Sequence, residues 1–203
     1  MKKMKNIFHR YIKLPFEIEK PPICNLKLKQ LKHQDIPYHK DGKMINFLAK
    51  LGLNILNTEV FYTPGNKSLP IHIDNSELDD HVKINISYGP PEGATRWWKP
   101  LNFDHEKEYN EQFDNKLDEE GKKDLIGLKD TYLQHRSIRL EEEECELLYE
   151  ANTDKPSLVN VGTFHSSYNP TDEGRWTLCF VIGKDNKYLY WDDAMEIFKD
   201  YIE

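Results

Sequence analysis

Two residues that commonly bind transition metals stand two positions apart in the segment Ile71-His72-Ile73-Asp74. Successive side chains of a β-strand point to opposite faces, so the segment, if it is a strand, sends His72 and Asp74 to one face and the isoleucines to the other. One imidazole and one carboxylate, completed by a second imidazole, form the ligand set that suits Fe(II) and leaves coordination positions open. The segment therefore predicts part of an iron site whose third ligand comes from another strand.

His165 is the candidate for the third ligand. It ends the segment Leu158–His165, and a single strand there would place Val159, Val161 and Thr163 on its face. A ligand at the end of an inward row fits the rim of a barrel. The alternative is a hydrogen-bonded histidine of the core or the surface, and a His-x-Asp pair or a single histidine is weak evidence by itself. The hypothesis depends on the whole arrangement.

An arginine begins the apolar segment Arg175-Trp-Thr177-Leu-Cys-Phe-Val-Ile, ten residues after the candidate third ligand. The strand period puts Arg175 and Thr177 on one face. An arginine inside a barrel is costly unless an anion meets it, because a buried unpaired charge loses its hydration. A guanidinium can hold a carboxylate through two hydrogen bonds, and the threonine hydroxyl can add a third. The pair predicts a carboxylate pocket; the alternative is an exposed arginine paired with Asp172 or Glu173.

Together, His72-x-Asp74, the distant His165 and Arg175-x-Thr177 resemble the signature of the 2-oxoglutarate- and Fe(II)-dependent dioxygenase superfamily. The resemblance implies a double-stranded β-helix, or jelly roll, in which the triad holds Fe(II) and the arginine and threonine bind 2-oxoglutarate. It also implies that O2 is consumed and that a small molecule or a protein side chain is hydroxylated, with release of succinate and CO2. Related halogenases replace the carboxylate ligand to admit chloride, so Asp74 favours hydroxylation or another oxidation.

Two further residues are candidates for contact with the co-substrate. The resemblance covers residues 62–183, and Tyr62-Thr-Pro-Gly65 ahead of the His-x-Asp pair is similar to the prolyl-hydroxylase-like branch, which implies that Tyr62 touches 2-oxoglutarate. In the segment His81–Tyr88 polar and apolar residues alternate, with Asn85 in the polar set. If that set faces the interior, Asn85 could hydrogen-bond the co-substrate; the alternative is a solvent-facing row.

The pattern around these residues predicts a mostly β protein with flanking helices. Six segments favour strands, and many short strands without intervening helices are typical of a barrel or sandwich: Thr58–Thr63, Leu69–Asp74, His81–Tyr88, Cys145–Ala151, Leu158–Ser167 and Trp176–Gly183. Helical spacing predicts one or two helices within Leu26–Leu53, interrupted at Pro37, and a C-terminal helix over 190–203 with Asp192 as a possible N-cap. The charged stretch 102–140 is expected to be a partly helical insertion or flap.

Composition limits the class of protein. The 203 residues fit a single domain, 1–203, and the net charge of −7 disfavours nucleic acid as a partner. Three cysteines without a CxxC pair favour reduced thiols, and no sustained apolar run suggests a membrane segment. We therefore expect a cytoplasmic protein that acts on a small-molecule or peptide substrate. The sequence does not indicate an oligomeric state.

Two other functions fit the same residues. The chain could be a non-catalytic, cupin-like jelly-roll module that binds a metal or another ligand without turnover. It could also be a structural or interaction protein whose histidines are unrelated to one another. The first alternative keeps the metal site and loses the chemistry, whereas the second predicts that the three candidate ligands act independently.

Overall fold

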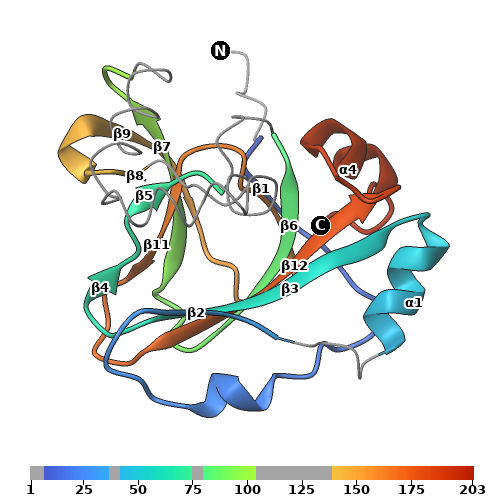
Figure 1. The fold of residues 1–203 in the computed structure, drawn as a ribbon, viewed down its shortest axis with the longest axis horizontal. Helices are drawn as coiled ribbons and strands as arrows, with labels where there is room; N and C mark the ends of the chain where they lie inside the picture. The colour runs from blue at the N-terminus through green and yellow to red at the C-terminus, as the bar shows by residue number, and fades with distance from the viewer. Residues whose placement is uncertain (1–6, 37–41, 75–79, 104–138) are drawn as a thin grey trace, which may run out of the picture.

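The computed structural model describes residues 7–36, 42–74, 80–103 and 139–203. Within them the chain is mostly β and forms two antiparallel sheets, as expected for a jelly roll (Figure 1). Residues 104–138, most of the expected insertion, lie outside the described residues. No helix in the described ranges combines the length and the apolar character needed to cross a membrane.

The larger sheet carries much of the candidate site. Its strands, in spatial order, are β1 (His9–Tyr11), β10 (Ser157–Asn160), β6 (Val82–Tyr88), β12 (Arg175–Lys184), β3 (Asn54–Thr63) and β2 (Lys32–Asp35), with β13 (Lys187–Tyr188) paired to β12. The long β12 lies between β6 and β3 and pairs with both along most of its length. The inner faces of these three strands therefore form one continuous surface.

The smaller sheet provides the opposite wall. Its strands, in spatial order, are β8 (Arg139–Leu140), β5 (Ile71–His72), β11 (His165–Asn169), β7 (Ala94–Pro100) and β9 (Cys145–Ala151), with β4 (Lys67–Ser68) paired to β11. The helical elements are η1 (Pro22–Asn25), α1 (Gly42–Lys50), η3 (Glu142–Glu144) and α4 (Trp191–Ile197). In Figure 1 the smaller sheet lies on the left and helices α1 and α4 on the right, with β6, β12 and β3 between them.

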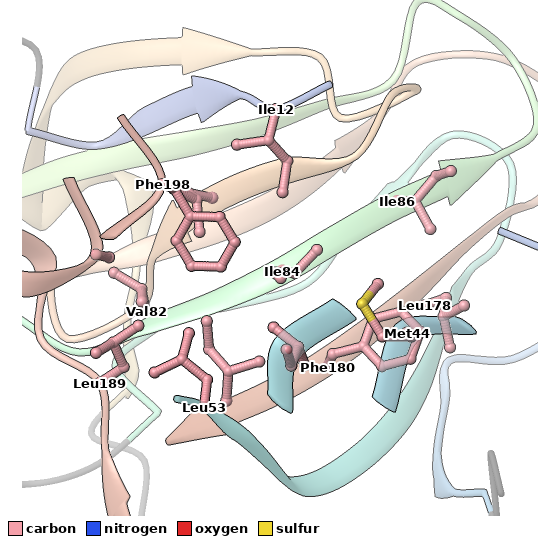
Figure 2. Packing of buried hydrophobic residues seen from close by; sticks show 14 of the residues in the cluster. Ile12, Met44, Leu53, Val82, Ile84, Ile86, Leu178, Phe180, Leu189 and Phe198 are labelled. Carbon is pink, nitrogen blue, oxygen red and sulfur yellow. The ribbon is translucent and has the colours of Figure 1, made fainter. Parts of the chain in front are cut away.

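The main hydrophobic core lies between the larger sheet and the two α-helices. Helix α1 contributes Met44, Phe47 and Leu48, which follow helical spacing and are at most 5% exposed. Figure 2 shows side chains of this core from β6, β12 and the chain's C-terminal part gathered around Phe180 and Phe198. The apolar face of the sheet is thus occupied by the helices, and its other face is left for function.

That other face is polar. On β6, Lys83, Asn85 and Ser87 alternate with core residues and are all less than 10% exposed. The sequence left open whether this set faces solvent or the interior, and the structure buries it between the sheets. Polar side chains are costly to bury without partners, so a buried polar row indicates a built site.

The expectation of one or two helices over Leu26–Leu53 is met by the α-helix α1, which lies after Pro37. Residues 32–35 are not helical but form the edge strand β2, which pairs with β3. The edge of β3 offers unpaired backbone groups, and satisfying them overrides a weak helical spacing. At the C-terminus, α4 ends at Ile197, and Tyr190 rather than Asp192 is its N-cap.

The expected strand Leu158–Ser167 is two strands in different sheets. After β10 the Asn160 side chain accepts a hydrogen bond from the Gly162 backbone N–H at 3.1 Å, a local turn that ends the strand. The chain then crosses to the smaller sheet and begins β11 at His165. The prediction of a single strand that carries Val159, Val161, Thr163 and His165 on one face is therefore wrong. His165 nevertheless lines the cavity between the two sheets.

Candidate metal centre

The structure brings the three predicted metal ligands together. His72 ends β5, Asp74 follows two residues later, and His165 begins β11 as the direct cross-strand partner of His72. Nε2 of His72 lies 3.3 Å, and Nε2 of His165 3.6 Å, from Oδ1 of Asp74. One potential ligand atom from each side chain lies within 4.8 Å of the others, which is compatible with a single transition-metal ion.

Both imidazoles are oriented by backbone carbonyls. Nδ1 of His72 lies 2.8 Å from the Pro70 carbonyl oxygen, and Nδ1 of His165 lies 2.9 Å from that of Thr163. A carbonyl only accepts, so each Nδ1 carries the hydrogen and each Nε2 keeps its lone pair. Burial, and then the neighbouring His72, lower the pKa of His165 to about 4. The His165 ring is therefore neutral at pH 7, the form that binds a metal.

A lysine that the sequence reasoning did not assign to the site completes the surroundings of Asp74. Nζ of Lys83 lies 2.7 Å from Oδ2 of Asp74 and 3.0 Å from Oε2 of Glu59. Burial alone would lower the pKa of Lys83, but the two carboxylates outweigh it and raise that pKa. Burial likewise would raise the pKa of Asp74, but Lys83 and the imidazoles hold it well below its ordinary value. The lysine is charged and the aspartate ionised.

The triad faces a cavity between the two sheets. Its lining includes all three predicted ligands, together with Asn85 and Thr177 from the larger sheet. The side-chain oxygen of Asn85 is buried and has no hydrogen-bond partner within the described part of the chain. The predicted co-substrate contacts Asn85 and Thr177 thus lie in the same cavity as the metal triad.

Arg175 is only 2% exposed and is not among the residues that line this cavity. Its Nη2 donates to Oγ1 of Thr153 at 3.0 Å, and a chain of hydroxyls continues through Ser87 to Thr177, with oxygens 2.8 and 2.9 Å apart. Its Nη1 has no partner in the described ranges. Burial lowers the pKa of Arg175 to about 10, which leaves it charged at pH 7. The alternative of an exposed arginine paired with a neighbouring acid is therefore wrong.

Glycines bring the backbone close to Arg175. A Cβ placed on Gly93 would lie 2.5 Å from Cδ of Arg175, and one on Gly89 would lie 3.1 Å from its Cα. Both glycines come from the connection between β6 and β7, which therefore approaches the arginine closely at two positions that lack a side chain. This close approach holds the guanidinium beside the hydroxyl chain.

Tyr62 does not reach the cavity, which corrects its expected contact with the co-substrate. Its ring packs on Trp176, with centroids 4.9 Å apart, as part of the main core. The preceding residue, Phe61, lines the cavity instead. Adjacent residues of a strand face opposite sides, and the pairing of Phe61 with Thr177 sets which of the two faces inward.

A second group of metal-ligating side chains lies beside the first. His33, Asp35 and Glu59 have potential ligand atoms within 4.8 Å of one another. However, Oε2 of Glu59 already pairs with Lys83, and Oδ1 of Asp35 accepts a hydrogen bond from Asn57 at 3.0 Å. The His33 ring stacks on Phe61 at 4.4 Å. Because these side chains already have partners within the protein, His72, Asp74 and His165 form the better candidate metal site.

No protein-family model matches the chain, and no curated protein sequence matches it. Solved structures do resemble it in fold. HygX from Streptomyces hygroscopicus with nickel and 2-oxoglutarate bound is 13% identical, with 79% of this chain and 72% of that chain covered and a TM-score of 0.41. The non-heme monooxygenase ThoJ in complex with nickel is 15% identical, with 70% and 52% covered and a TM-score of 0.33. EvdO2 from Micromonospora carbonacea var. aurantiaca is 10% identical, with 80% and 72% covered and a TM-score of 0.37. The chain spans 59% of the length of apo HygX.

Proposed function

We propose that this protein is an Fe(II)- and 2-oxoglutarate-dependent oxygenase that hydroxylates a small molecule or a protein side chain. The observation that carries the proposal is the triad: the Nε2 atoms of two imidazoles converge on one oxygen of Asp74 at the wall of a cavity. Two imidazoles and one carboxylate on one side of a metal leave three positions of an octahedral ion open. The donor set therefore fits Fe(II).

Each residue has a distinct task in this proposal. His72, Asp74 and His165 would hold the metal. When bound, Fe(II) with 2-oxoglutarate supplies the oxidation of a substrate C–H bond by O2, with the balance RH + 2-oxoglutarate + O2 giving ROH + succinate + CO2. The protein contributes binding, orientation and the exclusion of water from the space between the sheets.

Arg175 and the hydroxyl groups beside it would bind the co-substrate. Arg175 is buried and charged, and no carboxylate of the described residues pairs with it, so a bound anion would compensate its burial. The hydroxyl chain from Arg175 ends at Thr177 inside the cavity, where a carboxylate could displace the existing hydrogen bonds. Asn85 adds a buried acceptor oxygen on the same wall, which suits a donor group of the substrate, because 2-oxoglutarate at neutral pH offers only acceptors. We propose the superfamily and not the prolyl-hydroxylase-like branch, because Tyr62, the residue that suggested that branch, lies in the core.

One observation favours a second candidate, a non-catalytic cupin-like binding module. Lys83 pairs with Asp74 at 2.7 Å and compensates its charge, which also suits an ion-paired pocket for a ligand. Such a module would bind a ligand in the same cavity without consuming O2. Because such a module can also hold a metal, the formation of succinate with consumption of O2 separates the two candidates.

Anaerobic titration tests the proposal. Fe(II) is added to the full chain and 2-oxoglutarate is then added while the visible absorption spectrum is recorded. Chelation of the bound Fe(II) by the keto acid is expected to give a charge-transfer band, and Asp74→Ala is expected to remove it. Succinate formation is then measured in air with panels of small molecules and peptides. Absence of the band, together with succinate production no greater than in Asp74→Ala, would reject an oxygenase.

A further inference from the structure

The two oxygens of the Asp74 carboxylate have different partners. Oδ1 faces the two imidazoles, at 3.3 Å from His72 and 3.6 Å from His165. Oδ2 faces away from them and pairs with the ammonium of Lys83 at 2.7 Å. A charge-assisted contact this short directs one lone pair of the carboxylate away from the position where a metal would sit.

Lys83 is itself held in place. Its Nζ contacts Oε2 of Glu59 at 3.0 Å, and Asn57 donates to the other oxygen of that carboxylate at 3.2 Å. The ammonium also lies 5.8 Å from the centre of the Phe61 ring. Lys83 is 6% exposed and Glu59 8% exposed, so water competes little for either charge. The row Glu59–Lys83–Asp74 is a buried ion network with one rigid end on β3 and the other at the triad.

We infer that Lys83, held by Glu59, is a positioning residue that reserves Oδ2 of Asp74 and leaves the carboxylate a single oxygen for the metal. This inference rests on the proposed function. A carboxylate can bind a metal through one oxygen or two, and binding through two would occupy a further coordination position. The proposed reaction needs three open positions, two for the keto acid and one for O2. Lys83 therefore protects the position on which the reaction depends.

A lysine in this cavity has two other possible roles, and each predicts a different outcome. If Lys83 binds a carboxylate of the co-substrate directly, its loss weakens 2-oxoglutarate binding and leaves the metal's own coordination unchanged. If Lys83 only stabilises the fold, its loss lowers stability and weakens metal and co-substrate binding together. Under the inference, its loss lets Asp74 use both oxygens and removes a positive charge near the metal, so metal affinity is kept or increased.

The test uses the full chain with Mn(II), which is stable in air, and compares the wild type with Glu59→Gln and the double variant Glu59→Gln/Lys83→Met. The double variant removes the charge of Glu59 together with that of Lys83, so that Glu59 is not left as a buried carboxylate without its cation. The single variant is the matched control, because Lys83 keeps its ion pair with Asp74. Mn(II) affinity is measured by electron paramagnetic resonance of the free ion, bound water by relaxation of exchangeable solvent, and 2-oxoglutarate affinity by calorimetry on the Mn(II)-loaded protein.

For the double variant the expected result has three parts. Mn(II) affinity is equal to that of the control or tighter, the number of exchangeable waters falls from three to two, and 2-oxoglutarate affinity falls by about tenfold or more. Three waters retained in the double variant would overturn the inference and favour direct co-substrate binding by Lys83. Parallel loss of Mn(II) and 2-oxoglutarate affinity would overturn it in favour of a structural role. A wild type that binds no Mn(II) would instead refute the proposed function.

Discussion

His72 and His165 are direct partners across the β5–β11 pair, and their ring centroids lie 4.5 Å apart. Cross-strand partners in an antiparallel pair have neighbouring side chains on the same face, so backbone pairing alone sets the spacing of these two candidate metal ligands. Asp74 enters the same space from just beyond the end of β5. The sheet therefore preorganises the donor set, and neither imidazole depends on a loop for its position.

Replacement of Arg175 is expected to separate co-substrate binding from metal binding. Arg175→Ala removes the buried cation and should weaken 2-oxoglutarate binding by about 100-fold, a typical loss for a charged hydrogen-bonding partner. Mn(II) affinity should stay within about threefold, because the arginine is not among the triad. Calorimetry with Mn(II) and then 2-oxoglutarate measures both. Loss of Mn(II) binding would show that the role assigned to Arg175 is wrong.

Tyr62→Phe is the matched control for that experiment. The Tyr62 ring packs in the main core against Trp176, away from the cavity. The variant should bind 2-oxoglutarate within about twofold of the wild type, because the substitution leaves the cavity wall unchanged. A large loss of 2-oxoglutarate affinity would restore the contact that the prolyl-hydroxylase-like resemblance implied.

The glycine against Arg175 offers an indirect test of the same pocket. In Gly93→Ala the new methyl group would lie 2.5 Å from Cδ of Arg175, so the guanidinium must move. We expect a loss of about 1 to 3 kcal/mol in the free energy of unfolding and weaker 2-oxoglutarate binding. Urea denaturation and calorimetry measure the two effects.

Gly42→Ala is the control for Gly93→Ala. Gly42 begins α1, is exposed, and a methyl group there meets its nearest atom at 3.6 Å, an ordinary contact. Alanine favours helix over glycine by up to about 1 kcal/mol, so this variant should be at least as stable as the wild type and keep full 2-oxoglutarate affinity. Equal behaviour of the two variants would mean that Gly93 has no special relation to Arg175.

The protein is expected to lose stability in mild acid. Burial, and then the charge of Arg10, lower the pKa of His9 to about 4, against 6.5 for an unperturbed histidine. Between pH 6.5 and 4 the unfolded state therefore binds more protons than the folded state, and the free energy of unfolding falls as the pH falls. Urea denaturation at intervals from pH 7 to 4.5 should show this decline.

His9→Gln tests the source of that decline. The variant cannot take up the proton, so its stability should depend less steeply on pH across the same window. The dependence should not vanish, because burial also lowers the pKa of His165 to about 4. An unchanged slope would show that His9 is not buried as a neutral ring.

The strand period predicted much of the fold and most of the site. It placed Arg175 and Thr177 on one face of β12, and the other face carries core residues, as the structure has them: Trp176, Leu178 and Phe180. That prediction needs only local geometry, because a side chain's face follows from its place in the strand. The expectation that His72 and Asp74 point into the same space also needed only this local geometry.

The ion pair between Lys83 and Glu59 could not be predicted from the sequence, because it depends on the register between strands that are distant in the chain. Strands β6 and β3 both pair with β12, where Cys179 is the partner of Asn85 on one side and of Glu59 on the other. Lys83 lies two residues from Asn85 on β6 and so reaches Glu59 diagonally across β12. No local pattern encodes that alignment. The sequence offered one signal: Lys83 lies in a segment whose alternate residues are apolar. If the lysine side chain of such a strand is buried, it needs a carboxylate partner, because a buried unpaired charge is costly.

Metal binding by the triad is the most direct test of the central claim. Mn(II) is titrated into the wild type, into His72→Ala, Asp74→Ala and His165→Ala, and into His33→Ala, whose ring belongs to the neighbouring group with ligand-like atoms. We expect one bound Mn(II) ion in the wild type and in His33→Ala, and a Mn(II) affinity reduced by about 100-fold or more in each triad variant. Binding that survives the loss of His165, or that disappears with His33, would contradict it.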